Sequence, residues 1–442
     1  MQSKMDRAFV LHFSERVAMR TLKPQDVATC IYCGLERGFT NEHVFPAGLG
    51  GDDDRFLLTN MVCGHCNTNI FSPIELQFMR SSPTALARIF LQPHGRGRGK
   101  KASLPTIDTR ETTVLTENFG AVEGEVGTSG KAVILMQLVF LDDGRVGCTG
   151  SNAENPDDFF ASLSATLTDS IDLIEKIGIG KSAKFIVETV RWTEAGYESG
   201  ARYAAERPPV SGLWREVLHP SPSGKVCRPP TLYRRRAGQI VLRAPTGCDE
   251  LALLTRARKA LPALSVTTRE EAAVVNPLVH LSMSMELSTY ARVIAKIGVN
   301  AIAYAYGRDY ARHHGFNGIK RAILTNKCAI PLSTKPSQDD PFSGVPADRH
   351  VVMVHFQKGR AGRYRVAVSA RLYGGATTWV WLSEKAVAPP ERAAILVVKY
   401  REHRIEEFNN LRQFVEAYPP KVPIEFIREQ MVKLYPALPH GI

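Results

Sequence analysis

The sequence predicts a mixed α+β protein with more than one domain, and three observations lead to this class. The chain has 442 residues, whereas a single domain rarely exceeds about 250 residues. Apolar residues recur at three- and four-residue spacing over residues 288–312, which is typical of an amphipathic helix. Apolar and polar residues alternate between turn signals over residues 350–382, which is typical of an antiparallel β-meander.

The composition narrows the class of protein. Hydrophobic residues make up 44% of the chain and charged residues 23%, close to globular averages, which excludes a disordered or fibrous protein. The formal net charge of +12 favours a polyanionic partner. The N-terminus lacks the apolar core of a secretory signal, and no stretch reaches the roughly 20 apolar residues of a membrane span. We therefore expect a soluble cytoplasmic protein with reduced thiols and no membrane contact.

Three regions follow from the distribution of glycine, proline and charge. We predict a compact module over residues 1–92, a mixed α+β region over residues 103–338, and a β-meander followed by a C-terminal helix over residues 345–442. A basic, glycine-rich linker that contains Arg96 and Arg98 separates the first two regions. Within the middle region, the pattern predicts a buried strand at 133–141, a helix at 155–177 and a strand at 184–192.

Four of the eight cysteines are paired in the first region. Cys30 and Cys33 form one Cys-x-x-Cys pair, and Cys63 and Cys66 form a second. Two such turns together supply the four thiolates of a tetrahedral zinc site, which would stabilise a module with little core of its own. On spacing alone, a structural zinc site without chemistry remains an alternative.

The residues between the two pairs add polar groups that a structural zinc site does not need. Glu42-His43 is followed by Val-Phe-Pro and then by Leu-Gly-Gly, Asn60 precedes the second pair, and Asn67 follows Cys66 directly. This stretch resembles the cysteine-rich branch of the HNH endonuclease family, whose motif has the order Glu-His, Pro, Leu-Gly-Gly, Asn and Cys-x-x-Cys-Asn. The resemblance covers about forty residues of the chain.

The resemblance implies a zinc-bound ββα-metal module and a role for each polar residue. His43 would be the general base, Asn60 would orient it through the hairpin loop, and Glu42 with Asn67 would hold one catalytic ion. Glu42 and Asn67 replace the more common Asp and His of the family. A carboxylate and an amide oxygen suit a hard ion, so this ion would be Mg²⁺ or Mn²⁺, distinct from a structural Zn²⁺ on sulfur.

A basic tract offers a surface for DNA. Residues 200–243 contain nine Lys or Arg and two Glu, with Arg234, Arg235 and Arg236 in succession. Together with Arg96 and Arg98, these arginines are our candidates for contacts with nucleic-acid phosphates. The alternative is a solvated charged face without a ligand.

The sequence thus predicts a metal-dependent HNH endonuclease that hydrolyses DNA phosphodiester bonds, and the family association suggests defence against foreign DNA. Two alternatives stay open: a non-catalytic zinc module that binds nucleic acid or a partner, and a nuclease switched on by a ligand or partner at the C-terminal region.

Overall fold

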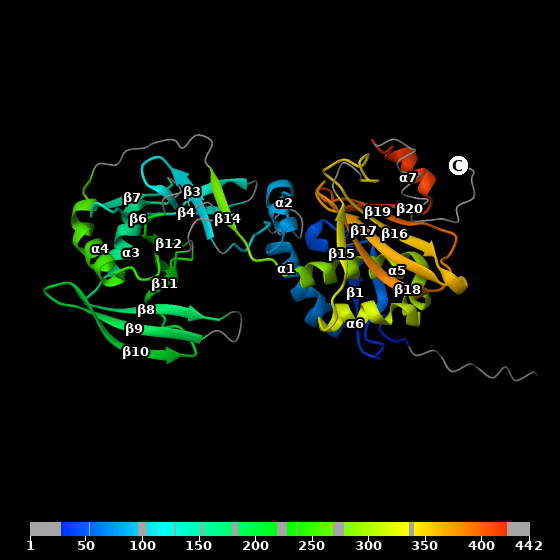
Figure 1. Ribbon diagram of the computed structural model, residues 1–442, viewed down its shortest axis with the longest axis horizontal. Helices are drawn as coiled ribbons and strands as arrows, with labels where there is room; N and C mark the ends of the chain where they lie inside the picture. Colours follow the sequence, from blue (N-terminus) through cyan, green and yellow to red (C-terminus); the bar gives the residue numbers. More distant parts are fainter. Residues whose placement is uncertain are drawn as a thin grey trace, which may run out of the picture.

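The computed structural model describes residues 28–52, 54–95, 104–109, 111–127, 130–151, 154–178, 184–218, 228–235, 237–267, 278–335 and 340–421. Within these residues the chain has seven α-helices and four sheets, which confirms a mixed α+β fold. Two lobes are visible (Figure 1). We call them the cysteine lobe, made of the described residues within 28–95 and 287–421, and the β lobe, made of those within 111–282.

The cysteine lobe begins with an antiparallel hairpin of β1 (Phe39–His43) and β2 (Leu57–Cys63). Between the strands lies a short 3-10 helix, η1 (Ala47–Leu49). After β2 the chain enters a π-helical turn, η2 (His65–Phe71), which continues into α1 (Ser72–Arg80) and is followed by α2 (Pro83–Leu91). Two strands, a π-helical turn and a helix therefore follow one another over residues 39–80.

The second part of this lobe is a six-stranded antiparallel sheet with the order β15-β18-β17-β16-β19-β20. Its strands are β15 (Leu332–Lys335), β16 (His350–Lys358), β17 (Tyr364–Arg371), β18 (Thr377–Ala386), β19 (Ala394–Lys399) and β20 (Arg404–Phe408). The predicted meander corresponds to β16, β17 and β18 and is confirmed. The helix α7 (Leu411–Ala417) follows; the rest of the predicted C-terminal helix, residues 422–442, lies outside the described residues.

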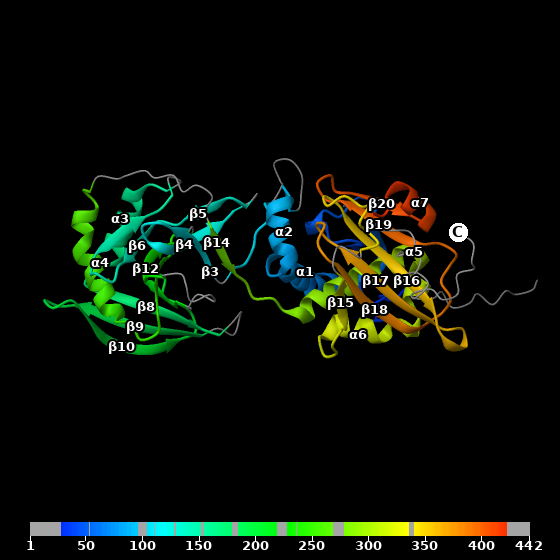
Figure 2. The same ribbon diagram turned by 45° about the horizontal axis from the view of Figure 1, so that its top comes forward.

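The long helix α5 (Leu287–Arg312) confirms the predicted helix at 288–312 and lies between the hairpin and the sheet (Figures 1 and 2). Its residues from Val293 to Ala303 are all buried, including the polar Lys296 and Asn300, so this part of α5 is a core helix. One hydrophobic core contains side chains of α5, of α6 (Asn317–Thr325), of residues 28–95 and of the meander. These helices therefore pack with residues 28–95, which differs from the predicted grouping of residues 103–338.

The β lobe contains an eight-stranded mixed sheet with the order β10-β9-β8-β11-β13-β12-β6-β7 and a four-stranded sheet with the order β14-β3-β4-β5. The strands are β3 (Glu111–Thr116), β4 (Gly120–Val126), β5 (Ala132–Ile134), β6 (Gln137–Phe140), β7 (Val146–Thr149), β8 (Ser170–Ile177), β9 (Lys184–Trp192), β10 (Tyr197–Ala205), β11 (Leu213–Val217), β12 (Thr231–Arg234), β13 (Ile240–Ala244) and β14 (Val279–Ser282). Two helices, α3 (Pro156–Thr166) and α4 (Glu250–Leu264), pack their apolar side chains into the core of the larger sheet.

Two predictions for the β lobe need correction, and one is confirmed. The predicted helix at 155–177 ends at Thr166, because from Ser170 onward exposed and buried residues alternate and form β8. The predicted strand at 133–141 is divided into β5 and β6, which pair with different neighbours. The strand at 184–192 is confirmed as β9.

Candidate metal centre and active site

The four paired cysteines come together at the base of the hairpin. The Sγ atoms of Cys30, Cys33, Cys63 and Cys66 all lie within 4.8 Å of one another, with 4.0 Å between Cys30 and Cys66 and 3.7 Å between Cys33 and Cys63. All but Cys33 are buried. Four converging thiols are the donor set of a structural Zn²⁺ site, so this cluster could hold a metal ion such as zinc.

The backbone around the cysteines explains why they converge. Gly34 donates its N–H to the carbonyl of Cys30 at 2.9 Å, and its left-handed φ of 71° closes the first turn. The N–H of Cys63 points at the sulfur of Cys30, at 3.4 Å. The contact with Cys66 lowers the pKa of the Cys30 thiol to about 4, whereas it raises the pKa of Cys66. The cluster thus favours a thiolate, the form that binds metal.

His43 belongs to β1, and Asn67 of η2 is bonded to the same strand. His43 is the last residue of the strand and is half-buried. The Asn67 side chain donates from Nδ2 to Thr40 Oγ1 at 3.0 Å and to the carbonyl of Asn41 at 3.1 Å. Since the amide nitrogen is engaged, Oδ1 is the atom that Asn67 would offer to a cation. The start of the helical segment is therefore fastened to the strand that ends in His43.

Asn60 shapes the hairpin through its backbone. It is exposed on β2 and has a φ of 58°, a left-handed conformation that Asn tolerates better than most residues. Opposite it, the register of β1 shifts between Thr40 and Glu42. Asn60 therefore lies at a bulge, and its carbonyl accepts a hydrogen bond from Arg308 of α5.

Glu42 faces the interior. Only 3% of it is exposed, and its carboxylate pairs with Lys296 of α5 and accepts a hydrogen bond from Asn300 at 3.1 Å. Lys296 also pairs with Glu75 of α1. Burial raises the pKa of Glu42 against the opposing effect of Lys296. The pKa of Lys296 is raised to about 12, because the two carboxylates outweigh its burial.

This placement bears on the predicted catalytic ion. Glu42 is buried and already paired with a cation, whereas Asn67 is partly exposed. As the two side chains lie, they do not fit a shared divalent ion unless Glu42 gives up a contact. Within the part of the chain that the structure describes, no second group of three or more His, Cys, Asp or Glu ligands resembles the cysteine cluster.

Sequence analysis missed Lys296, Asn300 and Arg308. Lys296 and Asn300 are fully buried on α5, and the signal available in the sequence was two polar residues within an otherwise apolar run. Buried polar groups require partners. Nothing local identifies these partners, because Glu42 and His43 are far away in the chain.

Two arginines of the densest part of the basic tract, Arg234 and Arg235, are paired within the β lobe. Arg234 lies 3.1 Å from Glu154, and Arg235 pairs with Glu216. Arg96, Arg98 and Arg236 lie outside the described residues. The positive charge of Arg234 and Arg235 is therefore balanced by carboxylates inside the lobe.

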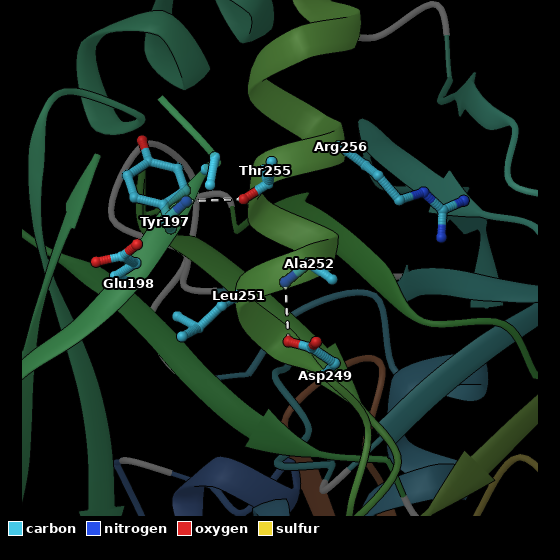
Figure 3. Close-up of a pocket in the computed structure, with 9 residues that line it drawn as sticks. Tyr197, Glu198, Asp249, Leu251, Ala252, Thr255 and Arg256 are labelled. Atoms are coloured by element: carbon cyan, nitrogen blue, oxygen red, sulfur yellow. Dashed lines mark hydrogen bonds between the residues drawn. The ribbon is translucent and has the colours of Figure 1, made fainter. Parts of the chain in front are cut away.

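A pocket of about 400 Å³ lies in the β lobe, between β10 and the start of α4 (Figure 3). Its polar groups serve the fold: Tyr197 donates its N–H to Thr255 Oγ1 at 2.9 Å, and Asp249 caps α4 by accepting from the N–H of Ala252 at 3.0 Å. The side chain of Arg256 points away from the others. None of the predicted site residues lines this pocket.

Comparison of the chain with protein-family models, curated proteins and solved structures gave no match. Among the described residues, no helix combines the length and apolarity needed to cross a membrane.

Proposed function

We propose that the chain is an HNH endonuclease that hydrolyses DNA phosphodiester bonds with His43 as the general base. The observation that carries this proposal is the contact of Asn67 with β1. The first strand of the hairpin, β1, ends in His43, and Asn67, the residue directly after Cys66, is bonded to that same strand at Thr40 and Asn41. These are the residues and the order of elements that the family motif implies.

The chemistry suits the residue types. An imidazole titrates near neutral pH and can accept the proton of an attacking water. The cysteine cluster has a separate role, because four thiolates would close the coordination of Zn²⁺ and leave no position for substrate. Zinc would therefore hold the hairpin to the helical segment and fix the position of His43.

The proposed catalytic ion is Mg²⁺ or Mn²⁺, with Asn67 Oδ1 and Glu42 as its protein ligands. It would neutralise charge that develops on the phosphate. Glu42 would first have to exchange Lys296 or Asn300 for the ion. Metal dependence and the DNA substrate rest on the family resemblance, as do cytoplasmic location and a role in defence against foreign DNA.

A second candidate function has one observation in its favour. The pairing of Glu42 with Lys296 leaves the predicted acidic ligand neutralised. This would suit a non-catalytic zinc module that binds nucleic acid or a protein partner and uses the hairpin only as a scaffold.

A plasmid-cleavage assay on the purified protein separates the two functions. We expect cleavage with Mg²⁺ or Mn²⁺, none with EDTA, and a loss of roughly 10²- to 10⁴-fold for His43→Ala. The matched control is His65→Ala: His65 is exposed between two of the cysteines and bonds to Asn69 at 3.2 Å. Equal activity of both variants would exclude His43 as the base, and DNA binding without cleavage would favour the second function.

A further inference from the structure

We propose that α5 is part of the active site and that Asn300 is its positioning residue, which fixes β1 at Glu42 and His43. The catalytic meaning of this inference rests on the proposed function. The anchoring of β1 by α5 can be tested without any enzymatic activity.

Asn300 uses both ends of its amide group. Its Nδ2 donates to Glu42 Oε1 at 3.1 Å and to the carbonyl of His43 at 2.9 Å, while its Oδ1 accepts from the hydroxyl of Tyr32 at 2.6 Å. Asn300 is fully buried. Because one planar group donates twice and accepts once, its orientation is fixed, and neither Asp nor Leu could make all three bonds.

The contacts of α5 with the hairpin recur every four residues. Lys296 pairs with Glu42, Asn300 binds Glu42 and His43, and Arg308 donates to the carbonyl of Asn60. Between them, the ring of Tyr304 packs on Phe56 with 5.0 Å between centroids. Residues four apart lie on one helix face, so Lys296, Asn300 and Tyr304 place one face of α5 along the hairpin over about 12 Å. Arg308 follows a kink at Gly307 and extends the contact beyond that face.

The bond to His43 explains how a helix far away in the chain can affect the proposed base. The carbonyl of His43 belongs to the same residue as the imidazole, so holding this carbonyl limits where the ring can lie. Misplacing a reacting group by about 1 Å can cost roughly 10²-fold in rate. Asn300 therefore acts through His43 and needs no contact with the substrate.

The decisive variant is Asn300→Ala, with Arg292→Ala as the matched control. Arg292 lies on the same helix but donates to the carbonyl of Ile323, at 2.8 Å, away from the hairpin. We expect Asn300→Ala to lower kcat by about 10²-fold with little change in KM for DNA, since a misplaced base slows chemistry more than binding. Arg292→Ala should retain kcat.

Hydrogen exchange supplies the readout that does not depend on activity. In Asn300→Ala the amides of β1 and β2 should exchange faster than in the wild type, while those of β16 and β17 and the zinc content stay unchanged. Arg292→Ala should leave the hairpin amides unaffected. If Asn300→Ala proves too unstable to purify, Tyr32→Phe removes the bond to Asn300 Oδ1 together with the longer bond to the carbonyl of Lys296. It leaves the two bonds of Asn300 to β1 in place and should show the same changes to a smaller degree.

The outcomes separate this inference from the proposed function. A wild-type protein that cleaves no DNA, together with faster hairpin exchange in Asn300→Ala, would support the anchoring and overturn the nuclease assignment. An active wild type with unchanged kcat and unchanged hairpin exchange in Asn300→Ala would overturn the anchoring and leave His43 as the base. Equal slowing by Arg292→Ala and Asn300→Ala would reduce α5 to general support of the fold and would also overturn the inference.

Discussion

Both lobes bury charged residues, but the charges join different parts of the chain. In the β lobe, Arg243 pairs with Glu123 and Glu216, all within one stretch of the sequence that forms adjoining sheets. In the cysteine lobe, Lys296 pairs with Glu42 and Glu75. The residues of the β lobe lie between these partners in the sequence. The β lobe is thus built from one continuous segment, whereas the cysteine lobe needs two distant ones.

This difference predicts separate responses to damage. The described residues within 28–95 share their hydrophobic core with α5 and contain the cysteine cluster. We therefore expect this segment to need the metal, Lys296 and α5 in order to fold. The β lobe has its own hydrophobic core beneath α3 and α4. We therefore expect the two lobes to unfold separately, and the following experiments test this from the largest effect to the smallest.

Loss of zinc should have the largest effect. Cys63→Ser should lose the single Zn²⁺ per chain that a four-cysteine cluster binds, and the hairpin should unfold because binding energy contributes directly to folding. Metal analysis and region-resolved hydrogen exchange would measure both. Cys148→Ser, on β7 of the other lobe, is the matched control and should keep the zinc. A zinc-free wild type with a fully protected hairpin would contradict the prediction.

Removal of the Lys296 charge should have the second-largest effect, a loss of free energy of unfolding. Lys296→Met leaves the buried carboxylate of Glu42 and the partly buried carboxylate of Glu75 without their cation, which typically costs about 3–5 kcal/mol. Lys320 is also buried, but its partner is a neutral group, the carbonyl of Ala311 at 3.1 Å, and burial lowers its pKa to about 8. Lys320→Met should therefore cost less, about 1–3 kcal/mol.

Urea denaturation would measure both lysine variants, with exchange protection assigning each transition to a lobe. Arg243→Met provides the counterpart in the β lobe and should shift only the transition of that lobe. If Lys296→Met destabilised both lobes equally, the two would form one cooperative unit.

A fall in pH should also destabilise the cysteine lobe before the β lobe. His350 is fully buried, accepts at Nδ1 from the N–H of Tyr373 at 3.1 Å, and lies 3.1 Å through Nε2 from the carbonyl of Leu49. Burial lowers its pKa from 6.5 to about 3. Between these values the unfolded chain binds the extra proton, so stability falls as pH falls, by up to about 1.4 kcal/mol per pH unit.

The variant His350→Phe should be less stable at neutral pH but should lose part of this pH dependence. The matched control is His280→Phe on β14, because His280 is exposed and its loss should leave the slope unchanged. Measurements of unfolding free energy between pH 4 and 7 would distinguish the two. Identical slopes for His350→Phe and wild type would contradict the assignment.

The sequence predicted what depends on short spacing. The cysteine pairs, the alternation in β16 to β18 and the apolar stripe of α5 are local patterns, and each is present as expected. The end of α3 was missed because Phe159, Leu163 and Leu167 at helical spacing continue into Ile171, which belongs to a strand. There the period changes from 3.6 to two within a few residues, and an isolated apolar residue fits either pattern.

What could not be predicted are contacts between distant segments. The motif gives Glu42 a ligand role, but it cannot show that Lys296 and Asn300 lie beside it. Ser72 and Glu75 have the spacing of a helix capping box, yet Glu75 pairs with Lys296 and no side chain caps α1. Tertiary packing decides which of several partners a carboxylate takes, and this information is spread over the whole chain.

Of these experiments, replacing arginines of the basic tract should have the smallest effect on the protein, and it tests the β lobe alone. Arg234 and Arg235 are bonded to Glu154 and Glu216, so replacing both with Ala should destabilise the β lobe by about 1–3 kcal/mol. The dependence of DNA affinity on salt should stay nearly constant, because it reports phosphate contacts.

Arg202 is the matched variant in the same tract. Its side chain is 60% exposed and lies 3.9 Å from Glu175, a weak exposed pair that leaves the guanidinium free to meet a phosphate. Arg202→Ala should leave stability unchanged, and if β10 lies along DNA it should reduce the slope of log affinity against log salt by about one. Affinity titrations at several salt concentrations would decide between the arginines. A slope reduced by about two in the Arg234 and Arg235 double variant, with Arg202→Ala unchanged, would mean that the internal ion pairs of the β lobe open to bind phosphate.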